Sequence, residues 1–143
     1  MALQRVPVVY LAGGMRTKWQ DEVISALKGK YLVIFIDPRN HGMTEERAYT
    51  SWDLEGVRRA DIVFAYLEAD NPSGAGLALE IGFAAGLSAA PQATRKQVVF
   101  VCEPAHPHVR YFGMARACSD SVFEDLQAGI KQLEDVIANF DSR

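Results

Sequence analysis

Residues 61–86, DIVFAYLEADNPSGAGLALEIGFAAG, contain the pattern of a strand, a turn and a helix in a row. The run from Asp61 to Leu67 is rich in β-branched and aromatic residues, which is typical of a buried strand. A glycine-rich turn follows, and an apolar helical pattern then extends from Gly74 to Ser88. The same pattern places one carboxylate, that of Glu80, among residues that should face the core. A carboxylate in this position requires an explanation.

The rest of the chain repeats the alternation of strand and helix. Further runs typical of fully buried strands are Val6–Ala12, Tyr31–Ile36 and Gln97–Cys102, and further helical patterns are Trp19–Lys28 and Glu45–Arg59. Such alternation favours a parallel sheet that is covered by helices on both faces. The chain is therefore predicted to be a single α/β domain over residues 1–143. Its fold is predicted to be a flavodoxin-like, doubly wound parallel sheet of about five strands.

The last segment carries an apolar stripe with the spacing 3,4,3,4,3. The stripe consists of Phe123, Leu126, Ile130, Leu133, Ile137 and Phe140. Ser121 and Glu124 have the S-x-x-E spacing of a capping box, which predicts a helix that begins near Ser121. The stripe is suited either to packing on the sheet or to a contact between subunits.

Composition and charge exclude several classes of partner. The chain has 143 residues, 49% of them hydrophobic, and a net charge of -3 with interspersed signs. Because the chain has no stripe of basic residues that could neutralise phosphates, we do not expect nucleic acid as a partner. The N-terminal apolar run is too short for a signal peptide or a transmembrane helix, so we expect a cytoplasmic protein without a membrane partner. The two cysteines lack a CxxC motif and the three histidines lack metal-ligand spacing, so no metal is expected.

A ligand of a doubly wound sheet binds beyond the carboxyl ends of the strands. The loops that follow the four predicted strands are rich in glycine, proline and polar residues. They read AGGMRTKW (12–19), DPRNHGMT (37–44), EADNPSGAG (68–76) and EPAHPHVRYFG (103–113). We expect these loops to form the rim of a small-molecule site.

Two carboxylates point toward the predicted core from helices at this edge. Glu80 lies in the second turn of its helix, where burial raises the pKa of a carboxyl group and the helix N-terminus favours its charged form. Asp53 shares a helical stripe with Val57 and Ala60. Taken alone, Glu80 is better explained as a carboxylate at the edge of the face that bonds a backbone N–H or an arginine, and Asp53 as a solvated acid near Arg58 or Arg59. Together they could divide the roles of nucleophile and proton donor, as in glycosyl transfer by a retaining mechanism.

Three segments resemble the nucleoside 2-deoxyribosyltransferase superfamily, which includes N-glycosidases of nucleoside monophosphates. They are VVYLAGG (8–14), WDLEGVRRADIVFAYL (52–67) and NPSGAGLALEIGFAAG (71–86), and the similarity covers roughly Val8 to Ala90. Its most specific part is the pattern G-x-x-x-E-x-G-x-A, formed by Gly76, Glu80, Gly82 and Ala84.

The resemblance implies catalytic roles for three residues. Glu80 would attack the anomeric carbon and form a covalent deoxyribosyl–enzyme intermediate. Asp53 would contact the nucleobase and help to protonate it as it leaves, and the Tyr10 hydroxyl would orient Glu80. The resemblance implies no cofactor.

The loops supply the candidate binding residues. Glycines in the 73–76 turn let backbone approach a sugar, and Arg16 could hold a 5′-phosphate together with backbone N–H groups. In transferases of the superfamily a neighbouring subunit contributes an asparagine, and the nearest match to it is Ser121. Several relatives carry an acid aligned with about Gly74, whereas this chain has Asp70 earlier in the loop. The expected substrate-binding residues are Gly13, Gly14, Met15, Arg16, Asn71, Ser73, Gly74, Gly76 and Ser121.

By resemblance, we expect an enzyme that transfers the 2-deoxyribosyl group between nucleobases by cleaving the N-glycosidic bond of 2′-deoxynucleosides. The expected partners are nucleosides or nucleotides, free nucleobases and further copies of the chain, as a dimer or a higher oligomer. Two alternatives stay open. One is hydrolysis of the N-glycosidic bond of nucleoside 5′-monophosphates, and the other is a nucleotide-binding module without turnover.

Overall fold

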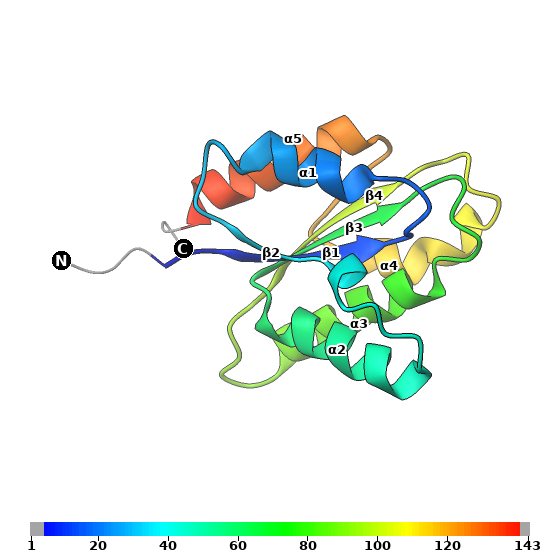
Figure 1. The fold of residues 1–143 in the computed structure, drawn as a ribbon, viewed down its shortest axis with the longest axis horizontal. Helices are drawn as coiled ribbons and strands as arrows, with labels where there is room; N and C mark the ends of the chain where they lie inside the picture. Colours follow the sequence, from blue (N-terminus) through cyan, green and yellow to red (C-terminus); the bar gives the residue numbers. More distant parts are fainter. Residues whose placement is uncertain (1–4, 141–143) are drawn as a thin grey trace.

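The computed structural model describes residues 5–140 and contains one five-stranded sheet in the order β2-β1-β3-β4-β5 (Figure 1). All four strand pairs are parallel. The strands are β1 (Val8–Gly13), β2 (Ile34–Ile36), β3 (Ile62–Leu67), β4 (Gln97–Cys102) and β5 (Ser121–Phe123). This order is that of flavodoxin-like doubly wound proteins, so the predicted fold class is confirmed.

Helices cover both faces of the sheet (Figure 1). The α-helices are α1 (Trp19–Leu27), α2 (Glu46–Arg59), α3 (Ala75–Ala89), α4 (Gly113–Ala117) and α5 (Leu126–Ala138), and the short 3-10 turns are η1 (Pro38–Asn40) and η2 (Val109–Phe112). Helices α1 and α5 lie on one face, and α2, α3 and α4 lie on the other. Among residues 5–140, no helix combines the length and the apolar character needed to cross a membrane.

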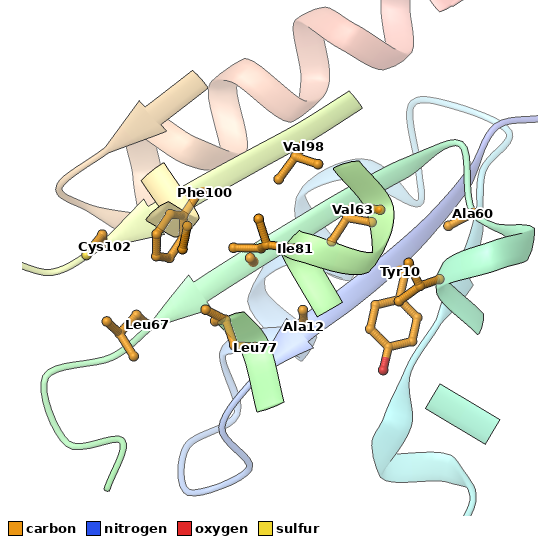
Figure 2. Close-up of a cluster of buried hydrophobic side chains, with 14 of the residues drawn as sticks. Tyr10, Ala12, Ala60, Val63, Leu67, Leu77, Ile81, Val98, Phe100 and Cys102 are labelled. Carbon is orange, nitrogen blue, oxygen red and sulfur yellow. The ribbon is translucent and has the colours of Figure 1, made fainter. Parts of the chain in front are cut away.

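The strands send alternate side chains into the two layers of core. In β1, Val9 and Leu11 pack in the cluster beneath α1 and α5, whereas Tyr10 and Ala12 pack in the cluster beneath α2 and α3. Figure 2 shows the second cluster, in which Ile81 of α3 lies over the central strands. The Tyr10 ring stands at the edge of this cluster, with its hydroxyl pointing away from the other labelled side chains. The Tyr10 ring therefore belongs to the apolar core, whereas its hydroxyl supplies a polar group at the edge of that core.

Strand β2 departs from the prediction of full burial. Only Ile34–Ile36 forms a strand, and the Ile34 and Leu32 side chains are exposed. The reason is topological, because β2 is the edge strand next to β1 and has a neighbour on one side only. Sequence composition alone does not distinguish such an edge strand from a central one.

The predicted start of the C-terminal helix is wrong. Ser121 pairs with Val99 of β4 as the first residue of β5, and helix α5 begins at Leu126. Its cap is Asp125, whose carboxylate accepts a hydrogen bond from the Ala128 backbone N–H at 2.9 Å. The stripe on α5 packs against the sheet, with Ile130, Leu133 and Ile137 buried.

Candidate active site

A buried tyrosine and a buried glutamate meet between β1 and α3. Tyr10 is the third residue of β1, and Glu80 lies in the second turn of α3. The Tyr10 hydroxyl donates a hydrogen bond to Glu80 Oε2. Tyr10 is 0% exposed and Glu80 is 8% exposed, so the contact is almost closed to solvent. The unusual carboxylate of the sequence is therefore buried against a hydroxyl donor.

A glycine in α2 makes room for the tyrosine ring. A Cβ atom built at Gly56 would lie 2.8 Å from the Tyr10 ring and 3.1 Å from Ile36. Both distances are shorter than an ordinary van der Waals contact. Helix α2 can therefore lie close against β1, which brings Asp53, one turn earlier in α2, to the same edge as Tyr10.

Burial dominates the electrostatics of Glu80. The pKa of Glu80 is raised to about 8, chiefly by burial and to a smaller extent by the negative charge of Asp53, while the Tyr10 hydrogen bond opposes the rise. Burial and the neighbouring carboxylates also raise the pKa of Tyr10, so its hydroxyl keeps its proton and remains a donor. Burial raises the pKa of Asp53, and the Tyr10 hydroxyl and His41 oppose that rise. The Asp53 charge thus contributes to the raised pKa of Glu80, so the two carboxylates interact electrostatically.

A cavity of about 200 Å³ opens between these carboxylates and the loops at the carboxyl edge of the sheet. It is lined by Tyr10, Gly13, Gly14, Met15, Pro38, Asp53, Asn71, Ser73, Gly74, Ala75, Gly76, Leu77 and Glu80. The three expected catalytic residues and seven of the nine expected binding residues thus border one cavity. It lies where β1 and β3 run side by side and their crossovers go to opposite faces.

Two expected binding residues do not line this cavity. Arg16 is exposed on the loop after β1. Ser121 lies in β5, which β3 and β4 separate from β1. Ser121 was expected to reach the site of a neighbouring copy of the chain, not the site of its own copy. This role stays a prediction.

The loop before α3 is fixed by its own hydrogen bonds. Asn71 Oδ1 accepts from the backbone N–H groups of Ser73 and Gly74, at 3.3 and 3.2 Å. Gly74 has a φ of +78°, and a Cβ there would lie 2.5 Å from Leu67 and 2.8 Å from Phe112. Glycine is therefore required at this position for its backbone conformation and for its lack of a side chain. The arrangement directs the first turn of α3 into the cavity.

The sequence analysis missed His41. This residue follows η1 in the loop after β2, and its Nε2 atom lies 3.4 Å from Asp53 Oδ1. Its ring packs edge-on against Trp52, with 4.9 Å between the ring centroids. Strand order could have indicated this residue. Because β2 pairs with β1, the loop after β2 lies at the same edge of the sheet as the loop after β1. Among residues 5–140, no three His, Cys, Asp or Glu side chains form a group that could hold a metal ion.

The fold and the cavity define a class of protein, a flavodoxin-like α/β protein with a carboxylate pair and a buried tyrosine where the strand order reverses. The profile of the family described as nucleoside 2-deoxyribosyltransferase like matches residues 6–105, and the chain belongs to this family. Membership supports an enzymatic role. No protein of curated function matches the sequence.

Solved structures share the fold. A conserved protein from Enterococcus faecalis V583 superposes with a TM-score of 0.65 at 14% identity, over 92% of this chain and 99% of that one. A 2-deoxyribosyltransferase from the psychrotolerant bacterium Bacillus psychrosaccharolyticus superposes with a TM-score of 0.59 at 23% identity, over 85% of this chain and 88% of that one. At these identities the similarity establishes the fold alone.

Proposed function

We propose that this protein cleaves the N-glycosidic bond of 2′-deoxynucleosides and transfers the 2-deoxyribosyl group to a second nucleobase. One observation carries the proposal. The Glu80 carboxylate is buried, accepts a hydrogen bond from Tyr10, and faces a cavity that it shares with Asp53. Family membership supports nucleosides and nucleobases as the ligands.

The two carboxylates would divide the chemistry. An oxygen of Glu80 attacks C1′, the C1′–N bond breaks, and its electron pair leaves with the base. Asp53 gives its proton to a ring nitrogen of the departing base, and the sugar stays esterified to Glu80. A second base then attacks C1′ with its own ring nitrogen, loses its proton to Asp53 and releases the Glu80 carboxylate. The active form thus has Glu80 ionised and Asp53 protonated.

The pH profile should reflect this shared proton. Burial, opposed by the Tyr10 hydrogen bond and aided by the Asp53 charge, raises the pKa of Glu80 to about 8. The pair therefore holds one proton up to about pH 8, and the reaction proceeds from the form in which that proton lies on Asp53. Above about pH 8 both carboxylates are ionised and no proton is left for the base. We therefore expect kcat/KM to fall as the pH rises through about 8. A rate that continues to increase above pH 9 would contradict a proton-sharing pair.

Replacing Tyr10 with Phe should change both the rate and this profile. The substitution removes the hydroxyl donor to Glu80 and keeps the ring in the core. A hydrogen bond to a charged group contributes about 1.5–3 kcal/mol, so kcat/KM should fall about 10- to 100-fold. Without this donor the pKa of Glu80 rises further, and the alkaline limb of the kcat/KM profile should move to higher pH. An unchanged limb would show that Tyr10 does not act on Glu80.

A product assay tests the proposed function directly. The purified protein is incubated with deoxyadenosine, deoxyinosine or deoxynucleoside 5′-monophosphates, each with and without added cytosine or adenine. A new deoxynucleoside that forms only with an acceptor base is the expected result. Free base and deoxyribose 5-phosphate released from monophosphates without an acceptor would instead identify a hydrolase. Binding without any product would identify a nucleotide-binding module.

A further inference from the structure

The structure brings His41 and Asp53 together although twelve positions separate them in the sequence. The His41 side chain is 7% exposed, and its Nε2 atom lies 3.4 Å from Asp53 Oδ1. These two atoms are buried, and neither has a hydrogen-bond partner of standard geometry. A buried polar atom without a partner is costly, so two such atoms facing each other favour a direct interaction.

The backbone determines which nitrogen of His41 carries the proton. The Met43 backbone N–H donates to His41 Nδ1 at 2.8 Å. Because a backbone N–H can only donate, Nδ1 must present a lone pair. In the neutral ring the proton is then on Nε2, which faces Asp53. Gly42, with a φ of +63°, allows the sharp turn that brings Met43 back to the ring.

The loop that carries His41 is held in place by the ion pairs of Arg39 and by a ring contact of His41 itself. Asp37 is 4% exposed, and it accepts hydrogen bonds from the Arg39 backbone N–H and from the Arg39 guanidinium. The same guanidinium reaches Asp21 of α1 at 2.7 Å. The His41 ring packs against Trp52, the residue before Asp53. A ring fixed in this way can set the orientation of a carboxylate.

We propose that His41 is a positioning residue, whose Nε2–H holds Asp53 Oδ1 so that the other carboxylate oxygen is directed to the leaving nucleobase. This inference rests on the proposed function. His41 is not itself a proton donor to the base, because its Nδ1 is occupied by a backbone donor and cannot recover a proton from it. The ionisable groups that face Asp53 are Tyr10 from β1, Glu80 from α3 and His41 from the loop after β2.

Three variants test the proposal. His41→Phe keeps the ring against Trp52 and removes both nitrogens, whereas His41→Gln can place an amide N–H near the position of Nε2. His108→Phe is the matched control, since His108 is exposed and its loop, residues 103–113, was expected at the rim but contributes no residue to the cavity lining. We expect His41→Phe to lower kcat about 10-fold with KM changed less than about 2-fold, and His41→Gln to recover most of the loss. His108→Phe should match the unmodified protein.

The pH profile separates positioning from simple structural support. His41 lowers the pKa of Asp53, so its loss should raise that pKa. The acid limb of kcat/KM, where the pair loses the first of its two protons, should then move to higher pH. An unmoved limb, or a His41→Gln variant no better than His41→Phe, would overturn the proposal. So would a change confined to thermal stability.

A second measurement needs no turnover. Carbon-13 NMR of the Asp53 carboxyl group should show a higher titration midpoint in His41→Phe than in the unmodified protein and in His108→Phe. The same midpoint in all three proteins would overturn the role of His41 even if the product assay succeeds. If the product assay fails and the midpoint still moves, the proposed function is wrong and the His41–Asp53 interaction stands.

Discussion

Replacing Glu80 with Gln should lower kcat/KM by on the order of 10³-fold or more. The amide keeps the size of the side chain and still accepts a hydrogen bond from Tyr10, but it cannot form the ester to C1′. The measurement is the initial rate of base exchange with deoxyadenosine and an acceptor base. Trapping of the sugar on the protein, detected as a mass increase of intact protein, should occur with Glu80 and be absent from the variant. Retention of exchange would exclude Glu80 as the nucleophile.

The same variant should be more stable than the unmodified protein at alkaline pH. Burial raises the pKa of Glu80 from 4.5 to about 8, so the folded state holds this proton more tightly than the unfolded chain does. The contribution of this proton to the free energy of unfolding is fully present below the pKa that Glu80 has in the unfolded chain. It is lost as the pH rises through the pKa that Glu80 has in the folded protein. A neutral amide avoids the loss. Glu80→Gln should therefore gain roughly 2–5 kcal/mol over the unmodified protein above pH 8 and little near pH 4.

Replacing Gly129 with Ala should destabilise the fold by about 1–3 kcal/mol. Gly129 is buried in α5, and a Cβ there would lie 2.2 Å from Val101 of β4 and 3.3 Å from Phe64 of β3. The helix must then move away from the sheet. Urea unfolding followed by circular dichroism measures the loss.

Two further variants isolate the steric cause. Gly86 in α3 has nothing within 4 Å of a built Cβ, so Gly86→Ala should be neutral or stabilising by up to about 1 kcal/mol. Combining Gly129→Ala with Val101→Ala removes the clashing methyl groups. The double variant should therefore lose less stability than the sum of the two single losses. Additive losses would mean that the close contact with β4 is not the cause.

The sequence predicted the sheet well where local pattern decides the structure. The bounds of β4 match the predicted Gln97–Cys102, because residues 98–102 of this central strand form an unbroken apolar, buried run. The prediction failed for Ser121, whose spacing to Glu124 is that of a capping box. Its pairing with Val99 is a long-range interaction that local spacing does not reveal. The exposed Ile34 of β2 has the same origin, since strand order decides which strand lies at an edge.

The candidate site was predictable in its loops and carboxylates but not in its supporting contacts. Glu80 was noticed because a charge on an apolar helix face is unusual in any sequence. His41 has no such signal, because its relation to Asp53 depends on how α2 packs beside β1. The close approach at Gly56 that allows this packing is likewise a property of the folded chain.

Gly56 also limits how the site can vary. The space that separates α2 from β1 at this position is smaller than one methyl group beside the Tyr10 ring. The distance between the helix that carries Asp53 and the strand that carries Tyr10 thus depends on the absence of a side chain at Gly56. We call this distance the interval between α2 and β1. Any larger residue at position 56 widens that interval and moves Asp53 away from Tyr10. The shape of the cavity can therefore change through the loops that line it far more readily than through the α2–β1 contact.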